Sequence, residues 1–287
     1  MRLRSLLFVP GDRPERMEKA LGVGADALIL DLEDSVSRDN KAVARAAIAA
    51  FLARPRDRLV ALFVRINPLD SGMADDDLAG VIAARPDGIV LPKSEGGRSL
   101  ADLDRRLAAL GNTEAMILPI ATETAAALFT LGEYGGVTPR LAGLTWGAED
   151  LPAALGATTA READGRFTPP YEVARALTLF GAAAAGVAPI ETVYPAFRDL
   201  DGLSAYAARG ARDGFTGMMA IHPSQVPVIN DAFTPSAASV ARAREVVAAF
   251  AANPGAGVLA IDGKMIDAPH LKQAERVLAR AGVQKEP

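Results

Sequence analysis

The chain contains no cysteine and only two histidines, His222 and His270. The lack of cysteine excludes disulfides, thiolate nucleophiles and cysteine-ligated zinc, and two histidines are too few for a multi-histidine metal centre. Any bound metal would therefore be a hard cation held by oxygen atoms.

Long apolar runs and basic clusters are also missing. No segment approaches the length of a membrane span, and the first apolar run meets Pro10, Gly11 and Asp12 before the core of a signal peptide could form. The net charge is -4, from 31 basic and 35 acidic side chains, and no basic block is interleaved with aromatic residues. We therefore expect a cytoplasmic protein that binds neither a membrane nor nucleic acid.

Short apolar runs alternate with longer amphipathic stretches along the 287 residues. This alternation is typical of repeated β-then-α units around a parallel sheet, and eight such units predict a (β/α)₈ TIM barrel, in which active sites lie at the carboxyl ends of the strands. The expected strands lie near residues 4–9, 27–33, 59–66, 88–92, 115–121, 141–147, 189–194 and 217–221.

Two segments of the sequence do not fit the simple alternation of eight β-then-α units. Residues 152–169 are small and polar and predict a long loop after the sixth strand, which could cover a ligand. We expect the barrel to span residues 1–233 and a C-terminal helical extension to span residues 234–287. The extension is predicted to contain a helix, a glycine-rich turn, a short strand and a last helix that begins near Pro269.

Charged or polar side chains follow six of the expected strands. An isolated charge in the core of a buried strand costs several kcal/mol. These charged groups must therefore lie together at one solvent-exposed end of the sheet. They are Asp31, Glu33 and Asp34, then Arg65, Lys93, Glu123, Glu149 with Asp150, and His222.

Glu123 and Asp150 follow consecutive strands, the fifth and the sixth, which places two carboxylates side by side at the barrel mouth. Mg²⁺ takes octahedral oxygen ligands and commonly uses one or two protein carboxylates, so the pair predicts a magnesium site. The alternative is that each acid caps the helix after it.

Arg65 follows five apolar residues and precedes Asn67 and Pro68. Its guanidinium is always charged and presents a planar fork of donors suited to a carboxylate or a developing enolate oxygen. The alternative is a structural ion pair with Asp31, Glu33 or Asp34. These acids are interpreted as supporting residues that orient Arg65 or Lys93, complete a metal shell through water, or pair with the basic side chains.

Two other residues have simpler interpretations. His222 could act as a general base, although a single histidine at a strand end is more often a hydrogen-bonded packing residue. Trp146, the only tryptophan, is expected to pack at the rim of the barrel.

The motifs resemble the citrate lyase β-subunit-like group of the HpcH/HpaI aldolase/citrate lyase superfamily, which includes malyl-CoA and citramalyl-CoA lyases. The resemblance spans nearly the whole chain and keeps the family order. It rests on FVPGDRPERMEKA, GADALILDLEDSV with the later lysine and arginine of KAVAR, RINP, GIVLPK, GAEDL, AIHPSQV and DGKMIDAPH.

The resemblance implies a magnesium-dependent carbon–carbon lyase that cleaves a 3-hydroxyacyl-CoA thioester into acetyl-CoA and a 2-keto acid. Glu123 and Asp150 match the metal ligands, with Glu123 also at the substrate, and Arg65 matches the substrate-binding, oxyanion-stabilising arginine. Asp267 matches a catalytic acid that the family delivers from the C-terminal segment of a neighbouring subunit. A homotrimer or homohexamer is therefore expected.

Two positions depart from the family pattern. Met218 stands where a lysine is usual, which puts a basic contact to CoA or to the acidic cluster in doubt, and Glu191 replaces the usual aspartate of the seventh strand. The residues leave the acyl group open among citryl, malyl, β-methylmalyl and citramalyl. A malyl-CoA thioesterase, a CoA-independent class II hydroxy-keto-acid aldolase and a non-catalytic binding protein remain as alternatives.

Overall fold

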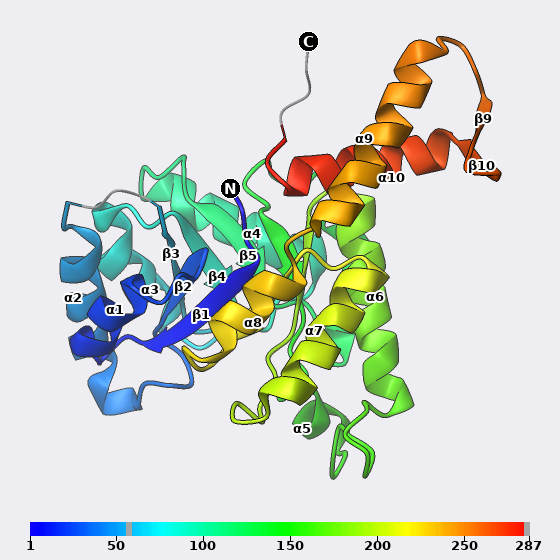
Figure 1. Cartoon of the computed structure of the whole chain (residues 1–287). Coiled ribbons are helices and arrows are strands. Elements are labelled where there is room, and N and C mark those ends of the chain that lie inside the picture. The colour runs from blue at the N-terminus through cyan, green and yellow to red at the C-terminus, as the bar shows by residue number, and fades with distance from the viewer. Residues whose placement is uncertain (56–58, 284–287) are drawn as a thin grey trace. The chain divides into compact units, whose positions relative to one another are not determined.

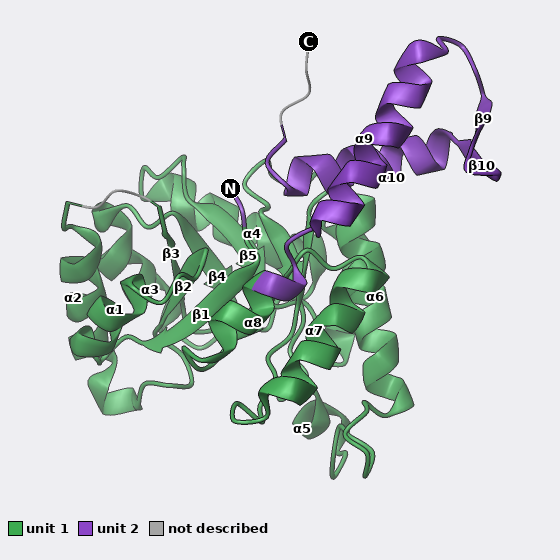
Figure 2. Cartoon of the chain, in the orientation of Figure 1, with its two compact units in different colours: residues 1, 3–230 green, residues 2, 231–287 purple. Residues whose placement is uncertain are grey.

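The computed structural model describes residues 1–55 and 59–283. Two compact units make up the chain: Met1 with Leu3–Asn230, and Arg2 with residues 231–287 (Figure 2). Among the described residues, no helix combines the length and the apolar character needed to cross a membrane.

The first unit is a barrel of parallel strands with helices outside it (Figure 1). Neighbours in the sheet run in the order β5-β4-β3-β2-β1-β8-β7-β6, and the bridges Ile117↔Leu141 and Ile120↔Thr145 join the two edges. The eight-stranded TIM barrel predicted from the sequence is thus confirmed. Its strands are β1 Ser5–Pro10, β2 Ala27–Asp31, β3 Ala61–Arg65, β4 Gly88–Leu91, β5 Met116–Pro119, β6 Gly143–Thr145, β7 Ala188–Glu191 and β8 Gly217–Ala220.

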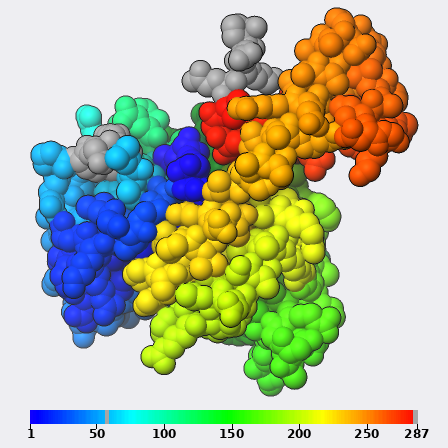
Figure 3. Space-filling view, in the orientation of Figure 1, coloured from blue at the N-terminus to red at the C-terminus, as the bar shows by residue number. Residues whose placement is uncertain are grey.

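Helices follow most strands, as expected. The connection from β5 to β6 differs, because it contains the two short 3₁₀ turns η3, Ala126–Phe129, and η4, Leu131–Glu133, in place of an α-helix. The other helical segments are α1 Pro14–Leu21, η1 Arg38–Asn40, α2 Lys41–Leu52, α3 Ala74–Val81, η2 Ile82–Ala84, α4 Gly96–Ala109, α5 Leu151–Leu155, α6 Pro169–Ala185, α7 Leu200–Asp213 and α8 Gln225–Ala232. Atoms of α1, α7 and α8 lie on the face of the first unit that Figure 3 shows.

The prediction of a loop over residues 152–169 was wrong at its start, where α5 forms a short helix. Pro152 occupies an early helical position, which suits its fixed φ, and Gly156 ends the helix in the left-handed region with φ +70°. Residues 157–168 are irregular apart from a bridge between Arg161 and Phe167, and Pro169 already belongs to α6.

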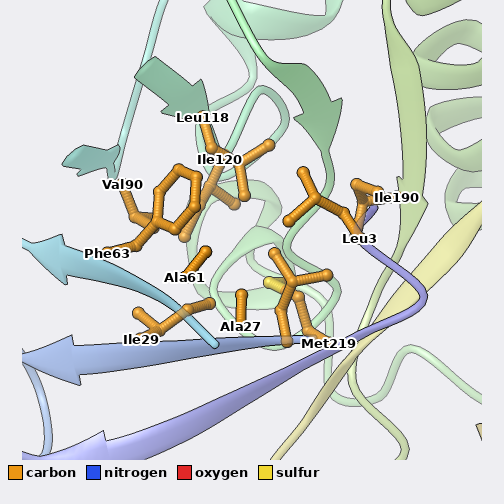
Figure 4. Packing of buried hydrophobic residues seen from close by; sticks show 11 residues of the cluster. Leu3, Ala27, Ile29, Ala61, Phe63, Val90, Leu118, Ile120, Ile190 and Met219 are labelled. Atoms are coloured by element: carbon orange, nitrogen blue, oxygen red, sulfur yellow. The ribbon is translucent and has the colours of Figure 1, made fainter. Parts of the chain in front are cut away.

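Apolar side chains from alternate strand positions fill the barrel interior, and Figure 4 shows them converging from several strands. Ile29 on β2 and Phe63 on β3 belong to this cluster. Because successive side chains alternate between the two faces of a strand, Asp31 and Arg65, two residues further on, continue the inner face at the carboxyl ends. The cluster comprises Leu3, Leu6, Ala27, Ile29, Ala61, Phe63, Val90, Leu118, Ile120, Ile190 and Met219.

The second unit contains α9, Ala237–Ala252, and α10, Ala268–Arg280, joined by the antiparallel hairpin of β9, Val258–Ile261, and β10, Lys264–Asp267. The helices and β9 match the expected extension, whereas β10 was not predicted. A small core of its own includes Ala243, Val246, Ile266 and Ala274.

Candidate active site

Arg65 and Asp31 meet at the carboxyl ends of β3 and β2, where they are paired in register. Arg65 Nε and Nη2 donate to the two oxygens of Asp31, each at 2.7 Å, and Nη1 lies 2.7 Å from Glu33 Oε2 and 3.6 Å from Asp34 Oδ2. The guanidinium carbon also lies 4.8 Å from the centre of the Phe8 ring. The ion pair considered as an alternative role is therefore present, yet Asp31 takes only two of the five N–H bonds, so others remain for a substrate oxygen.

Asp31 shapes the turn that carries the other acids. Its carboxylate also accepts the backbone N–H groups of Glu33, at 2.9 Å, and Ser35, at 3.1 Å. Burial alone raises the pKa of Asp31, but the hydrogen bonds and charge of Arg65 outweigh it and hold the pKa below its ordinary value. Asp31 therefore stays ionised and fixes the orientation of Arg65.

Lys93 connects this acidic turn with Glu123. Its Nζ donates to Glu33 Oε1 at 3.0 Å, and its backbone N–H donates to Glu123 Oε2 at 2.5 Å. The residue adopts φ +48°, a left-handed conformation uncommon for a residue with a side chain, and such conformations cluster at functional sites. Burial lowers the pKa of Lys93, but Glu33, followed by the charges of Glu123 and Asp150, raises it overall above its ordinary value.

Glu123 is a carboxylate in unfavourable surroundings. It is 4% exposed, and burial, with the nearby charges of Glu33 and Asp150, raises its pKa to about 8, while the N–H and charge of Lys93 act in the opposite direction. The pKa of Glu33 is raised as well, first by burial. A cation beside Glu123 would relieve this repulsion.

Neither Glu123 nor Asp150 acts as a helix cap. Glu123 bonds to Lys93, and Asp150, which is partly exposed at the start of α5, makes no side-chain cap hydrogen bond. A Cβ atom on Gly147, between the two acids in sequence, would lie 2.7 Å from Glu123 Cγ, so this position needs glycine. The segment that leads to Asp150 thus runs directly against Glu123.

The donor set of Glu123 and Asp150 suits Mg²⁺. Within the described residues, no group of three or more histidine, cysteine, aspartate or glutamate side chains could hold a metal ion. Mg²⁺ does not require such a group, because it is usually held by one or two carboxylates while water and substrate complete the octahedron.

Supporting residues behind the acidic turn were not identified from the sequence. The Nζ atom of Lys41 donates to the backbone oxygens of Leu32, at 2.6 Å, and Glu33, at 2.7 Å. Asn67 donates to Leu32 O and to the buried carboxylate of Asp77. The sequence feature that could have identified Lys41 and Asn67 is their position, because both are polar residues in motifs, KAVAR and RINP, that flank the charged strand ends.

The remaining candidates lie in different surroundings. His222 is exposed, with Nδ1 2.7 Å from Ser224 Oγ and its ring stacked 4.8 Å from that of Phe197. Asp267 belongs to the second unit, at the start of α10, where Oδ1 lies 2.6 Å from His270 Nδ1.

Met218 is completely buried and pairs in register with Glu191. Trp146, expected to pack at the rim of the barrel, follows the last residue of β6 and is completely buried.

Comparison with known proteins identifies relatives over nearly the full length. Residues 4–223 match the model of the HpcH/HpaI aldolase/citrate lyase family, and residues 173–284 match that of the C–C bond lyases of the TIM-barrel fold. The citrate lyase subunit beta-like protein of Mycobacterium tuberculosis is 37% identical, over 96% of this chain and 94% of that protein. A (3S)-malyl-CoA thioesterase of Cereibacter sphaeroides is 34% identical, over 97% and 94%.

Two further relatives extend the comparison. An L-malyl-CoA/beta-methylmalyl-CoA lyase of Cereibacter sphaeroides is 32% identical over 97% of this chain and 94% of its own. The crystal structure of the CitE protein of Mycobacterium tuberculosis, in complex with magnesium, acetoacetate and coenzyme A, matches with a TM-score of 0.79 and 35% identity over 98% of both chains. The chain belongs to the HpcH/HpaI aldolase/citrate lyase family.

Proposed function

We propose that the protein is a magnesium-dependent carbon–carbon lyase that cleaves a 3-hydroxyacyl-CoA thioester into acetyl-CoA and a 2-keto acid. The observation that carries this proposal is the mouth of the barrel, where a buried arginine with N–H bonds to spare accompanies a buried, destabilised carboxylate, Glu123. Relatives named as malyl-CoA lyase and a CitE structure that contains magnesium and coenzyme A support the choice of substrate class.

Glu123 and Asp150 would hold Mg²⁺. When bound, the ion supplies positive charge that orients the oxygens of the 2-hydroxy-acid end and lowers the pKa of the hydroxyl group. The protein contributes a buried carboxylate, that of Glu123, to which the Lys93 N–H is the only hydrogen-bond donor among the residues that the structure describes. Because this single N–H compensates little of the negative charge of Glu123, a bound cation is favoured at the site.

Arg65 would stabilise the negative charge on the thioester oxygen when the carbon–carbon bond breaks and an enolate forms. Burial by itself lowers the pKa of Arg65, but the hydrogen bonds of Asp31 and the charges of Asp31, Glu33 and Asp34 raise it above its ordinary value, so the side chain remains a cation throughout. Its bidentate contact with Asp31 holds the fork in one orientation before the charge develops.

Asp267 would give a proton to the carbon that leaves as acetyl-CoA, and in the synthetic direction it would remove that proton. Its carboxylate is about one-third exposed within the second unit and lies beside His270. We propose that residues 234–287 form an extension that delivers Asp267 to the site of a neighbouring subunit in a homotrimer or homohexamer.

The test is an assay with malyl-CoA, β-methylmalyl-CoA, citramalyl-CoA and citryl-CoA that identifies the products. Release of glyoxylate, pyruvate or oxaloacetate together with acetyl-CoA, or of glyoxylate with propionyl-CoA in the case of β-methylmalyl-CoA, supports a lyase, and the thioester that is cleaved identifies the acyl group. Addition of EDTA should abolish turnover and added Mg²⁺ should restore it. Absence of any keto acid with all four thioesters would refute the lyase assignment.

A malyl-CoA thioesterase is the second candidate, because several relatives that are 34% identical carry that name. Such an enzyme would release free CoA and malate, so a thiol reagent would detect product while no keto acid appeared. A CoA-independent aldolase would act on free hydroxy-keto acids and would have no use for Asp267.

A further inference from the structure

Trp146 directly precedes the glycine-containing segment that leads to Asp150, and its indole ring is completely buried. Thr145 pairs in register with Ile190, which belongs to the barrel interior, so Trp146 and Glu191, one residue further along each strand, lie on the outer face. There the indole Nε1 donates to Glu191 Oε1 at 2.5 Å. This bond ties the end of β6 to the end of β7.

Glu191 is a rigid acceptor. Its carboxylate is completely buried and accepts four hydrogen bonds, which join β7 to α6 and α7. The donors are Trp146 Nε1, Arg175 Nε at 2.7 Å, Tyr206 Oη at 2.9 Å and the backbone N–H of Thr192 at 3.1 Å. The Arg175 guanidinium compensates the negative charge and is itself anchored to Asp213 at 2.9 Å, so the acceptor for Trp146 has little freedom to move.

The residue after Trp146 contacts a carboxylate of the site. Gly147 N donates to Thr122 Oγ1 at 3.1 Å, and this hydroxyl donates to Gly147 O at 3.3 Å, which fastens the backbone beside Glu123. The close approach of Gly147 Cα to Glu123 leaves no space for a Cβ atom. A change in the position of Trp146 would therefore move Gly147 against Glu123 and displace Asp150, three residues further on.

We propose that Glu191 is a positioning residue that acts through Trp146 Nε1 to set the spacing between the Glu123 and Asp150 carboxylates. The inference rests on the proposed role of these two acids as Mg²⁺ ligands. Groups that orient metal ligands from behind typically change metal affinity by about 10- to 100-fold when they are altered. Here the orienting bond acts on the backbone that carries Asp150.

The test uses Trp146→Phe, which removes the N–H donor and keeps an aromatic ring against Phe167, whose ring centre lies 5.0 Å from that of the indole. Tyr206→Phe is the matched control, because it removes another hydrogen bond to the same oxygen of Glu191 but comes from α7 rather than from β6. Titration calorimetry with Mg²⁺ on the full chain should show binding weakened about 10-fold or more in Trp146→Phe and changed less than about twofold in Tyr206→Phe. The Mg²⁺ concentration for half-maximal turnover should shift by the same factor, and saturating Mg²⁺ should restore kcat.

Equal Mg²⁺ affinities in the two variants would overturn the inference, and wild-type protein that binds no Mg²⁺ would instead overturn the metal site itself. If Trp146→Phe does not fold, the single tryptophan permits a second variant, since growth on benzothienylalanine replaces this one indole N–H by sulfur and keeps the shape of the ring. The same weakening of Mg²⁺ binding is expected there. Unchanged binding in the fully substituted protein would refute the role of the Trp146–Glu191 bond.

Discussion

Glu123 should make the metal-free protein less stable as the pH rises. Its pKa is raised by burial, and by the charges of Glu33 and Asp150, from 4.5 to about 8. Between these values the folded protein keeps a proton that the unfolded chain has lost, so the free energy of unfolding falls as the pH increases. The stabilisation is complete below about pH 4.5 and is lost through pH 8.

The size of the effect follows from the two pKa values. At about 1.4 kcal/mol per unit of pKa, the difference corresponds to about 5 kcal/mol for full ionisation. This is comparable with the whole stability of many domains, about 5–15 kcal/mol. Glu123→Gln has nearly the same shape, remains neutral at every pH and keeps an oxygen that can accept the Lys93 N–H.

Urea unfolding in EDTA at pH 5, 7 and 9 measures the prediction. Glu123→Gln should match the wild type at pH 5 and exceed it by several kcal/mol at pH 9, whereas Glu149→Gln, at an exposed acid, should show no such trend. Mg²⁺ should stabilise the wild type increasingly towards pH 8 and have little effect on Glu123→Gln. A constant difference between Glu123→Gln and the wild type from pH 5 to pH 9 would refute the reasoning.

Three further variants test other parts of the site. Arg65→Lys should reduce kcat for thioester cleavage by about 10²- to 10³-fold in a keto-acid assay, since one ammonium cannot reproduce the bidentate contact with Asp31, and near-normal kcat would exclude an oxyanion role. Lys41→Met should lower the urea unfolding free energy by about 1–3 kcal/mol, because the carbonyls of Leu32 and Glu33 lose their charged donor and keep only the neutral N–H groups of Asn67 and Val36, and no loss would show that the Lys41 contacts are dispensable. Asp267→Asn should fold and bind Mg²⁺ as the wild type does but lose lyase turnover, and a variant that keeps turnover would remove Asp267 from proton transfer.

The barrel was predictable because two sequence signals, an apolar run and a charged or polar residue at its end, agree in six of the eight repeats. Buried parallel strands need continuous apolar runs, and charges can follow only where each strand reaches solvent. The run ALILD and the run ALFVR end on Asp31 and Arg65, and in the structure these two residues end β2 and β3 and are paired with each other. A pattern of strand ends therefore predicted which edge of the sheet carries the charges.

Local turn chemistry explains part of what was missed. The dipeptide Asp262-Gly263 separates β9 from β10, and both residues have positive φ, +52° and +71°, as a two-residue hairpin turn requires. This signal was present in the sequence and could have predicted the hairpin. The absence of a helix between β5 and β6 had no comparable signal, because the apolar residues of that segment suit a helix and a 3₁₀ turn alike.

Contacts between distant segments account for the rest. Trp146 and Glu191 are 45 residues apart, and the burial of both depends on how α6 and α7 cover β6 and β7. No periodicity in one strand indicates which residue of the next strand accepts its hydrogen bond. The expectation that Trp146 packs at the rim therefore did not include the buried carboxylate that accepts its indole N–H in the structure.

The two roles considered for Arg65 are complementary. Neutralising Asp31, Glu33 and Asp34 would require a positive charge but not the planar guanidinium of an arginine. Without these acids, the guanidinium would not be held in one orientation. The bidentate contact with Asp31 uses one side of the fork, and Glu33 is shared between Arg65 and Lys93. The acids thus fix the orientation of Arg65 before the reaction begins. Its remaining N–H bonds can then donate to an oxyanion without reorganisation, and a buried charge accelerates a reaction most under this condition.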